Sequence, residues 1–83
     1  MKQLSDQLLV ERVKNVLLVL SKRESWYLLS IASRVDLSIY TTRRILNYSL
    51  LPWGLVKKKW VKGERTIWSI TPKGMEQIKI FHP

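Results

Sequence analysis

The sequence has no cysteine, one histidine and few acidic residues. The absence of cysteine excludes disulfides and thiolate chemistry, and it fits a cytoplasmic location. The six acidic residues are scattered and form no pair for acid–base catalysis or metal binding, while His82 lies at the chain end. No glycine-rich phosphate loop occurs. The sequence therefore predicts no enzyme, no cofactor and no metal site.

Long apolar runs are also missing. The longest, Val16 to Leu20, is too short to cross a bilayer, and the first residues lack the charged-then-apolar layout of a secretion signal. A chain of 83 residues is long enough for one small domain, which we expect to span residues 1–83. We expect no membrane partner, and no small-molecule ligand is evident.

Positive charge is what the sequence has in excess. Fifteen basic residues stand against six acidic ones, which gives a net charge of +9. Between residues 38 and 74 Glu64 is the only acid, and the basic residues there are Arg43, Arg44, Lys57, Lys58, Lys59, Lys62, Arg65 and Lys73. Charge of one sign gathered in one segment predicts a polyanionic partner.

Residues 26–51 have the pattern of two helices joined by a tight turn. The first helix has an apolar face of Leu28, Ile31, Ala32 and Val35. Asp36-Leu37-Ser38 breaks this pattern, and Ser38 is predicted to cap the next helix. That second helix has an apolar face of Thr42, Ile45, Leu46 and Leu50, with Ile39 near its first turn. Its opposite face is polar and basic, and it comprises Tyr40, Thr41, Arg43, Arg44 and Asn47. The arrangement is that of a helix-turn-helix.

A β-hairpin is predicted over about 55–70, with strands at 55–62 and 65–70 around Gly63. Alternation places Val56, Trp60, Trp68 and Ile70 on one face and Lys57, Lys59 and Val61 on the other, although a slip of one residue would exchange the faces. Thr71 and Pro72 then begin a last helix over about 72–81, which an early Gly74 should weaken.

The N-terminal helix of the chain, predicted over about 4–21, is apolar on two sides. The subunit's own core should claim Leu9, Val13, Val16, Leu17 and Leu20, with Val10 at the border. The remaining apolar residues are either simply exposed or covered by a second subunit. We favour a homodimer whose interface comprises Leu4, Leu8, Leu18, Val19, Met75, Ile78 and Phe81.

Two local questions stay open at this point. Ser25 is a candidate cap for the helix that contains Leu28 and Val35, but Trp26-Tyr27 could instead form a short strand that pairs with the hairpin. The four tryptophans, Trp26, Trp53, Trp60 and Trp68, are predicted to pack in the core and hairpin rather than to stack on bases.

The order of these motifs resembles the winged helix-turn-helix family, in particular its MarR-like regulators. The resemblance rests on Gly54-Leu55-Val56, the basic hairpin and Ile70-Thr71-Pro72-Lys73-Gly74, and it covers Leu28 to Ile78. Asp36 stands where the family often has glycine, and Pro52-Trp53 should make the end of the second helix irregular. Size and composition also resemble small winged-helix proteins of thermophilic archaea and their viruses. The implied fold class is α+β, with a three-helix core, a two-stranded wing and a C-terminal helix.

The resemblance implies a sequence-specific regulator of transcription that binds double-stranded DNA. Its recognition helix would enter the major groove with Ser38, Tyr40, Thr41, Arg43, Arg44 and Asn47. Its wing would place Lys57, Lys58, Lys59, Lys62 and Arg65 on the flanking backbone or minor groove. Arginine suits guanine and asparagine suits adenine, but the arginines could equally contact phosphates alone, and the wing could be a solvated basic strand.

Two other classes of function remain open. One is an architectural protein that coats DNA without sequence preference. The other is a winged helix used for protein–protein contact, against which the basic wing argues.

Overall fold

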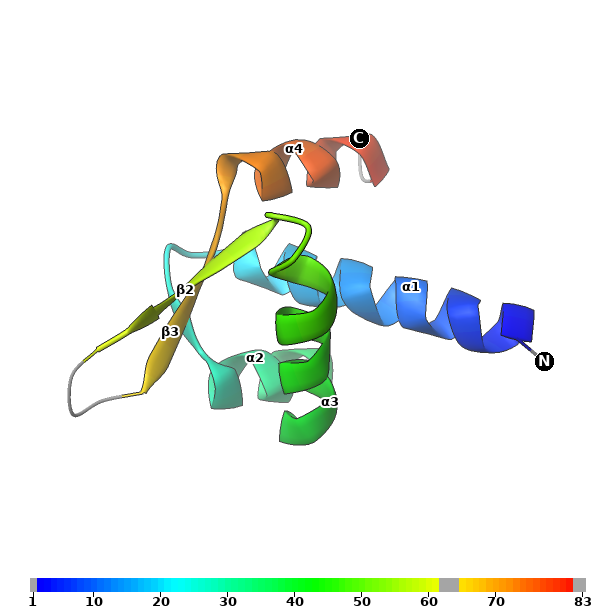
Figure 1. The fold of residues 1–83 in the computed structure, drawn as a ribbon, viewed down its shortest axis with the longest axis horizontal. Helices are drawn as coiled ribbons and strands as arrows, with labels where there is room; N and C mark the ends of the chain where they lie inside the picture. The colour runs from blue at the N-terminus through cyan, green and yellow to red at the C-terminus, as the bar shows by residue number, and fades with distance from the viewer. Residues whose placement is uncertain (1, 62–64, 82–83) are drawn as a thin grey trace.

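The computed structural model describes residues 2–61 and 65–81, with the side chains of 10–61 and 65–80. Figure 1 shows the order of the elements, which are α1 (Lys2–Leu20), β1 (Trp26–Tyr27), α2 (Leu28–Val35), α3 (Ile39–Ile45), a π-helical turn η1 (Leu46–Leu50), β2 (Val56–Trp60), β3 (Thr66–Ile70) and α4 (Pro72–Phe81). The predicted α+β winged helix-turn-helix is confirmed. Predictions about Leu4, Leu8, Leu9, Phe81, Lys62, Gly63, Glu64 and His82 fall outside the described side chains.

The three strands form one antiparallel sheet in the order β1-β3-β2. The open question about Trp26-Tyr27 is therefore settled in favour of a strand, and Tyr27 rather than Ser25 precedes α2, without a side-chain cap. Val56 lies opposite Ile70, and Trp60 lies opposite Thr66. Directly opposed residues share a face, so the predicted faces of the hairpin are confirmed.

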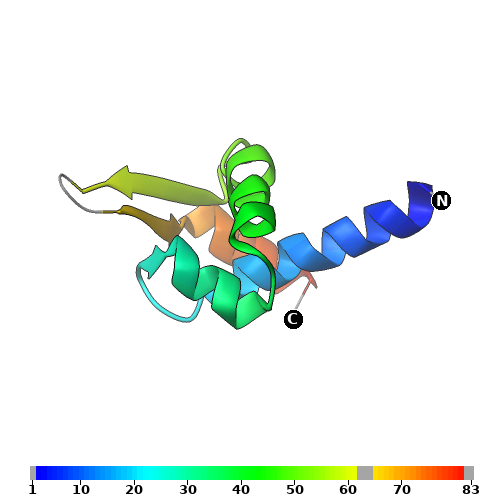
Figure 2. The same ribbon diagram turned by 90° about the horizontal axis from the view of Figure 1, so that it is seen from below.

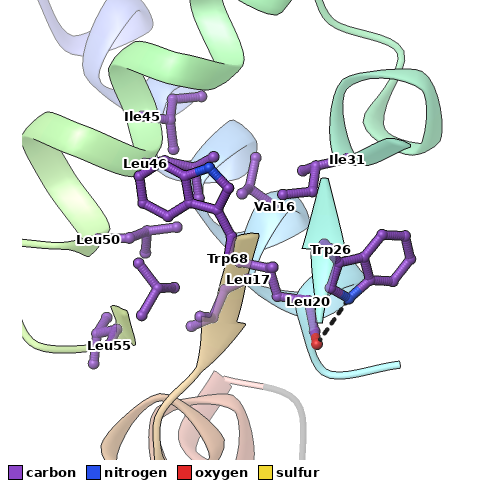
Figure 3. Packing of buried hydrophobic residues seen from close by; sticks show 11 residues of the cluster. Val16, Leu17, Leu20, Trp26, Ile31, Ile45, Leu46, Leu50, Leu55 and Trp68 are labelled. Carbon is purple, nitrogen blue, oxygen red and sulfur yellow. Dashed lines mark hydrogen bonds between the residues drawn. The ribbon is translucent and has the colours of Figure 1, made fainter. Parts of the chain in front are cut away.

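The core lies where α1, α2 and the predicted recognition helix, which α3 and η1 form together, meet the sheet (Figure 3). Its buried side chains are Val16, Leu17, Leu20, Trp26, Ile31, Ile45, Leu46, Leu50, Leu55, Val56 and Trp68. Trp26 also donates a hydrogen bond from Nε1 to the Leu20 carbonyl oxygen over 3.2 Å. This bond satisfies the indole N–H inside the core and ties β1 to the end of α1.

The turn of the helix-turn-helix depends on two short polar residues. Asp36 has a φ of 57°, in the left-handed region that glycine adopts most readily. Ser38 caps α3 as predicted, because its Oγ accepts a 3.0 Å hydrogen bond from the Thr41 amide. Beyond η1 the chain turns through Pro52-Trp53 to Gly54, whose φ is 76°. The irregular end expected for this helix is confirmed.

Several predictions of burial are wrong. Ile39 is 41% exposed, and Trp53 and Trp60 are 54% and 68% exposed, so only Trp26 and Trp68 are core tryptophans. Trp60 is the last residue of β2, at the end of the wing that extends past the helices in Figure 1. It shares a face with Trp68 but has no helix to cover it.

Two residues assigned to a partner subunit belong at least in part to this chain's own core. Val19 and Ile78 are partly buried and pack against the core cluster. Leu18 is half-buried, and Met75 is 41% exposed. Val19 and Ile78 pack within their own chain, and not only against a partner, because α1 and α4 lie against the same core. Among the described residues, no helix is long and apolar enough to cross a membrane.

Gly74 has a packing role that the sequence did not predict. Thr71 directly precedes α4, and its Oγ1 accepts a 3.1 Å hydrogen bond from the Gly74 amide. A Cβ on Gly74 would overlap the Leu55 carbonyl oxygen and lie 2.7 Å from Ile70 Cγ1. Glycine is therefore needed here because α4 passes directly over the backbone at Leu55.

We predict that Gly74→Ala destabilises the fold by about 1–3 kcal/mol, since the added methyl group overpacks against backbone. Helix propensity alone would give the opposite result, a gain of about 1 kcal/mol. Urea unfolding measures the difference, with Glu76→Ala, an exposed position of the same helix, as the control. An alanine variant as stable as the wild type would refute the close approach.

Candidate nucleic-acid interface

The outer face of the recognition helix is polar, as predicted. Tyr40, Arg43 and Arg44 are exposed, and Thr41 and Asn47 are half-buried. Ser38 lies at the helix start, but its hydroxyl is already engaged, because it also donates to Thr41 Oγ1 over 2.9 Å. Its evident role is to cap the helix.

One edge of this face is a stripe of Tyr40, Arg44 and Tyr48. The Arg44 guanidinium donates to the Tyr40 hydroxyl over 3.4 Å and lies 5.7 Å from the centre of its ring. Tyr48 is 76% exposed and lines the same two shallow hollows of the helix surface as Tyr40 and Arg44. Sequence reasoning missed Tyr48, although its four-residue spacing from Arg44 is a helical signal.

The other edge faces the wing. Asn47 donates from Nδ2 to the Arg43 carbonyl oxygen over 3.0 Å, and its Oδ1 accepts from Lys58 Nζ over 3.1 Å. A groove of about 470 Å³ lies between α2, α3 and the sheet. Arg43, Asn47, Lys58 and Arg65 give it polar walls, and the exposed Leu29 and Ile39 give it apolar ones.

The basic residues of the wing lie on both faces of the hairpin. Lys58 shares the face of Trp68 and lies 5.7 Å from the centre of that ring, while Lys57 and Lys59 lie on the opposite face and are exposed. The Arg65 guanidinium lies 5.4 Å from the centre of the Tyr27 ring. Figure 2 shows the hairpin projecting beside α2 and α3, so the basic wing and the recognition helix flank one side of the molecule.

Acidic groups are scarce among the described residues of this surface, and Asp36, in the exposed turn between α2 and α3, is the exception. The described residues of α2, α3, η1, β2 and β3 include no aspartate or glutamate. Within the described parts of the chain, no group of three or more histidine, cysteine, aspartate or glutamate residues could hold a metal ion. The surface is therefore suited to a polyanion.

Known structures share this fold. A MarR-family transcriptional regulator from Silicibacter pomeroyi has a TM-score of 0.79 at 20% identity, covering 99% of this chain and 55% of its own. The chain has a MarR-like winged-helix fold. No protein-family model and no curated protein sequence matches it.

Two further neighbours extend the comparison. A candidate DNA-binding protein from Ralstonia eutropha JMP134 has a TM-score of 0.74 at 28% identity, covering 88% of this chain and 96% of its own. Lactococcus lactis ZitR, a zinc-responsive MarR family member, has a TM-score of 0.72 at 20% identity, covering 82% of this chain and 47% of its own. The MarR-like chain thus spans about half the length of the MarR regulators it matches. The resemblance to archaeal and viral proteins stays a prediction.

We predict that Arg44→Ala weakens binding to a preferred duplex by about 1–3 kcal/mol, a factor of about 5 to 150 in Kd, and relaxes the preference at one base pair. The fold should survive, because Arg44 is exposed. Fluorescence anisotropy with single-base-pair variants of the duplex measures both effects. Lys79→Ala is the matched control, because Lys79 is an exposed basic residue on α4, outside α3 and the wing. Equal weakening on all duplexes would make Arg44 a phosphate contact.

Proposed function

We propose that this MarR-like chain is a sequence-specific, double-stranded DNA-binding regulator of transcription that acts in the cytoplasm and has no enzymatic activity. The observation that carries the proposal is the convergence of basic side chains from the recognition helix and the wing, whose helical and strand residues include no acidic side chain among those described. The likeness to MarR-family regulators and to a candidate DNA-binding protein supports it.

The interface divides into two kinds of contact. The recognition helix presents Tyr40, Arg43, Arg44 and Asn47 to the major groove, where base edges can be distinguished. The wing places Lys57, Lys59 and Arg65 against the flanking backbone or minor groove, where charge supplies affinity without sequence information. Sequence preference therefore depends on the helix, and salt-dependent affinity depends on the wing.

Selection of bound sequences from random duplexes tests the proposal directly. A regulator should enrich one site and bind it about 10³-fold or more tightly than random DNA at physiological salt. Tight, salt-dependent binding without enrichment would indicate an architectural DNA-coating protein instead. Failure to bind any duplex at that salt concentration would favour a protein–protein role.

The wing generates a second prediction. Replacing Lys57 and Lys59 by alanine should weaken binding to specific and random duplexes alike, because phosphate contacts carry no sequence information. The slope of log affinity against log salt should become shallower by about 0.9 for each phosphate that the wing no longer neutralises. Isothermal titrations between low and physiological salt measure the slope, with Lys22→Ala, in the exposed turn after α1, as the control. An unchanged slope would place the wing away from the DNA.

We also propose a homodimer through the outer side of α1 and α4. Leu18 and Met75 are the described members of this interface that are not packed into the chain's own core, and Leu4, Leu8 and Phe81 complete it from the sequence pattern. Two-fold pairing would set two recognition helices about one DNA turn, ~34 Å, apart and would favour a pseudo-palindromic site.

Met75→Glu should separate the subunits, since the interface would bury an unpaired charge. Light scattering across a concentration series should give the mass of two chains for the wild type and approach one for the variant. Lys73→Glu, exposed on the same helix, should remain dimeric. A wild-type mass of one chain at high concentration would refute the dimer.

A further inference from the structure

The side chain of Asn47 is held on both of its polar atoms. Nδ2 donates to the Arg43 carbonyl oxygen within the recognition helix, and Oδ1 accepts from the Lys58 ammonium on β2. Rotating the carboxamide by half a turn would bring Nδ2, a donor, against the ammonium and Oδ1, an acceptor, against the carbonyl. Both interactions would then be repulsive, so the two bonds together select one orientation of the amide.

The Lys58 side chain is itself directed toward the helix. Lys58 pairs with Trp68 across β2 and β3 and shares its face of the sheet. Its ammonium lies 5.7 Å from the centre of the Trp68 ring, and Trp68 is 3% exposed. A buried ring on one side and the Asn47 amide on the other thus define the position of the ammonium. Lys57, the preceding residue, lies on the opposite face of the sheet, so it serves as the matched control.

The hydrogen-bonding groups of the Asn47 amide that Arg43 and Lys58 do not occupy match the edge of a base. An asparagine carboxamide has two N–H donors and two acceptor positions, and the hydrogen bonds to Arg43 and Lys58 occupy one of each. One donor and one acceptor are left. The major-groove edge of adenine offers one acceptor, N7, and one donor, the N6 amino group. A held Asn47 therefore keeps the complement of groups that adenine requires.

We infer that Lys58 is a positioning residue for base recognition. It fixes the orientation of the Asn47 amide, so that a wing residue sets a base preference of the recognition helix. This inference rests on the proposed function, because it assumes that the helix reads DNA. It differs from the simpler expectation that Lys58, like its neighbours, only neutralises a phosphate.

The first test needs no DNA. Two-dimensional ¹⁵N–¹H NMR of the free protein resolves the Asn47 side-chain amide, which Asn47→Ala identifies by its disappearance. Lys58→Met keeps an unbranched apolar stem of similar size but removes the ammonium donor, so it should shift the Asn47 amide resonances. Lys57→Met should leave them unchanged. Unchanged Asn47 resonances in Lys58→Met would overturn the inference whatever the protein does with DNA.

The second test measures base preference. Wild type, Lys58→Met, Asn47→Ala, their double variant and Lys57→Met are titrated against the selected duplex and its single-base-pair variants. At one base pair the wild-type ratio of best to worst affinity should be about 5 to 150, and Asn47→Ala should lower it toward one. Lys58→Met should flatten the preference at the same base pair, and the double variant should lose no further discrimination. Lys57→Met should weaken all duplexes equally and keep the preference.

The outcomes distinguish a failure of the positioning role from a failure of the proposed function. If wild type prefers one site and Lys58→Met weakens every duplex equally, Lys58 is a phosphate contact and only the positioning role fails. Additive reductions of discrimination in the double variant would have the same meaning, because the effects of independent residues add. If wild type shows no preference over random DNA, the proposed function and this inference both fail.

Discussion

Burial of Trp68 at the centre of the sheet sets the position of the wing relative to the recognition helix. Trp68 lies on the middle strand, opposite Trp26 on one side and Lys58 on the other, and it is 3% exposed. The helices that bury it include those that form the helix-turn-helix. Because a large aromatic side chain in a close-packed core has little freedom to shift, it fixes where β3 leaves that core.

This attachment divides the basic surface into side chains that are held and side chains that extend into solvent. Arg44 is held by Tyr40, and Lys58 is held by Asn47 and Trp68. Lys57 and Lys59 stand exposed on the opposite face of the hairpin. A held side chain has less rotamer freedom to lose on binding, which favours geometric discrimination between bases, whereas an extended lysine can neutralise phosphates over a range of positions.

The part of the molecule away from the basic wing exposes several apolar side chains. A hollow of about 570 Å³ lies between α1, α4 and the chain that follows η1, with Val10 and Trp53 among its lining residues. Both of these side chains are about half exposed, and Met75 and Ile80 add apolar surface on α4. Met75 belongs to the proposed pairing of two copies. The hollow is a separate feature, because Lys14 and Lys73 also line it and Leu18 and Met75 do not.

Local signals in the sequence predicted most of the fold. Ser38 was identified as a cap because its hydroxyl acts within one turn of chain, and the recognition helix was found because Thr42, Ile45 and Leu46 repeat at helical spacing. The faces of the hairpin followed from alternation between Val56 and Ile70. Such features depend on residues close in sequence, so a single chain is enough to reveal them.

The tertiary structure decided what depends on distant neighbours. Trp60 and Trp68 share a face of the sheet, but only Trp68 has helices packed over it, so burial differs where the pattern is the same. Gly74 weakens a helix by propensity, yet it is required because the Leu55 backbone passes against it. Asn47 and Lys58 are eleven residues apart and meet only because the wing folds back beside the recognition helix. Periodicity and capping depend on residues that are close in sequence. Burial of a side chain under a helix, contact between two backbone segments and long-range hydrogen bonds form only once the elements are packed together.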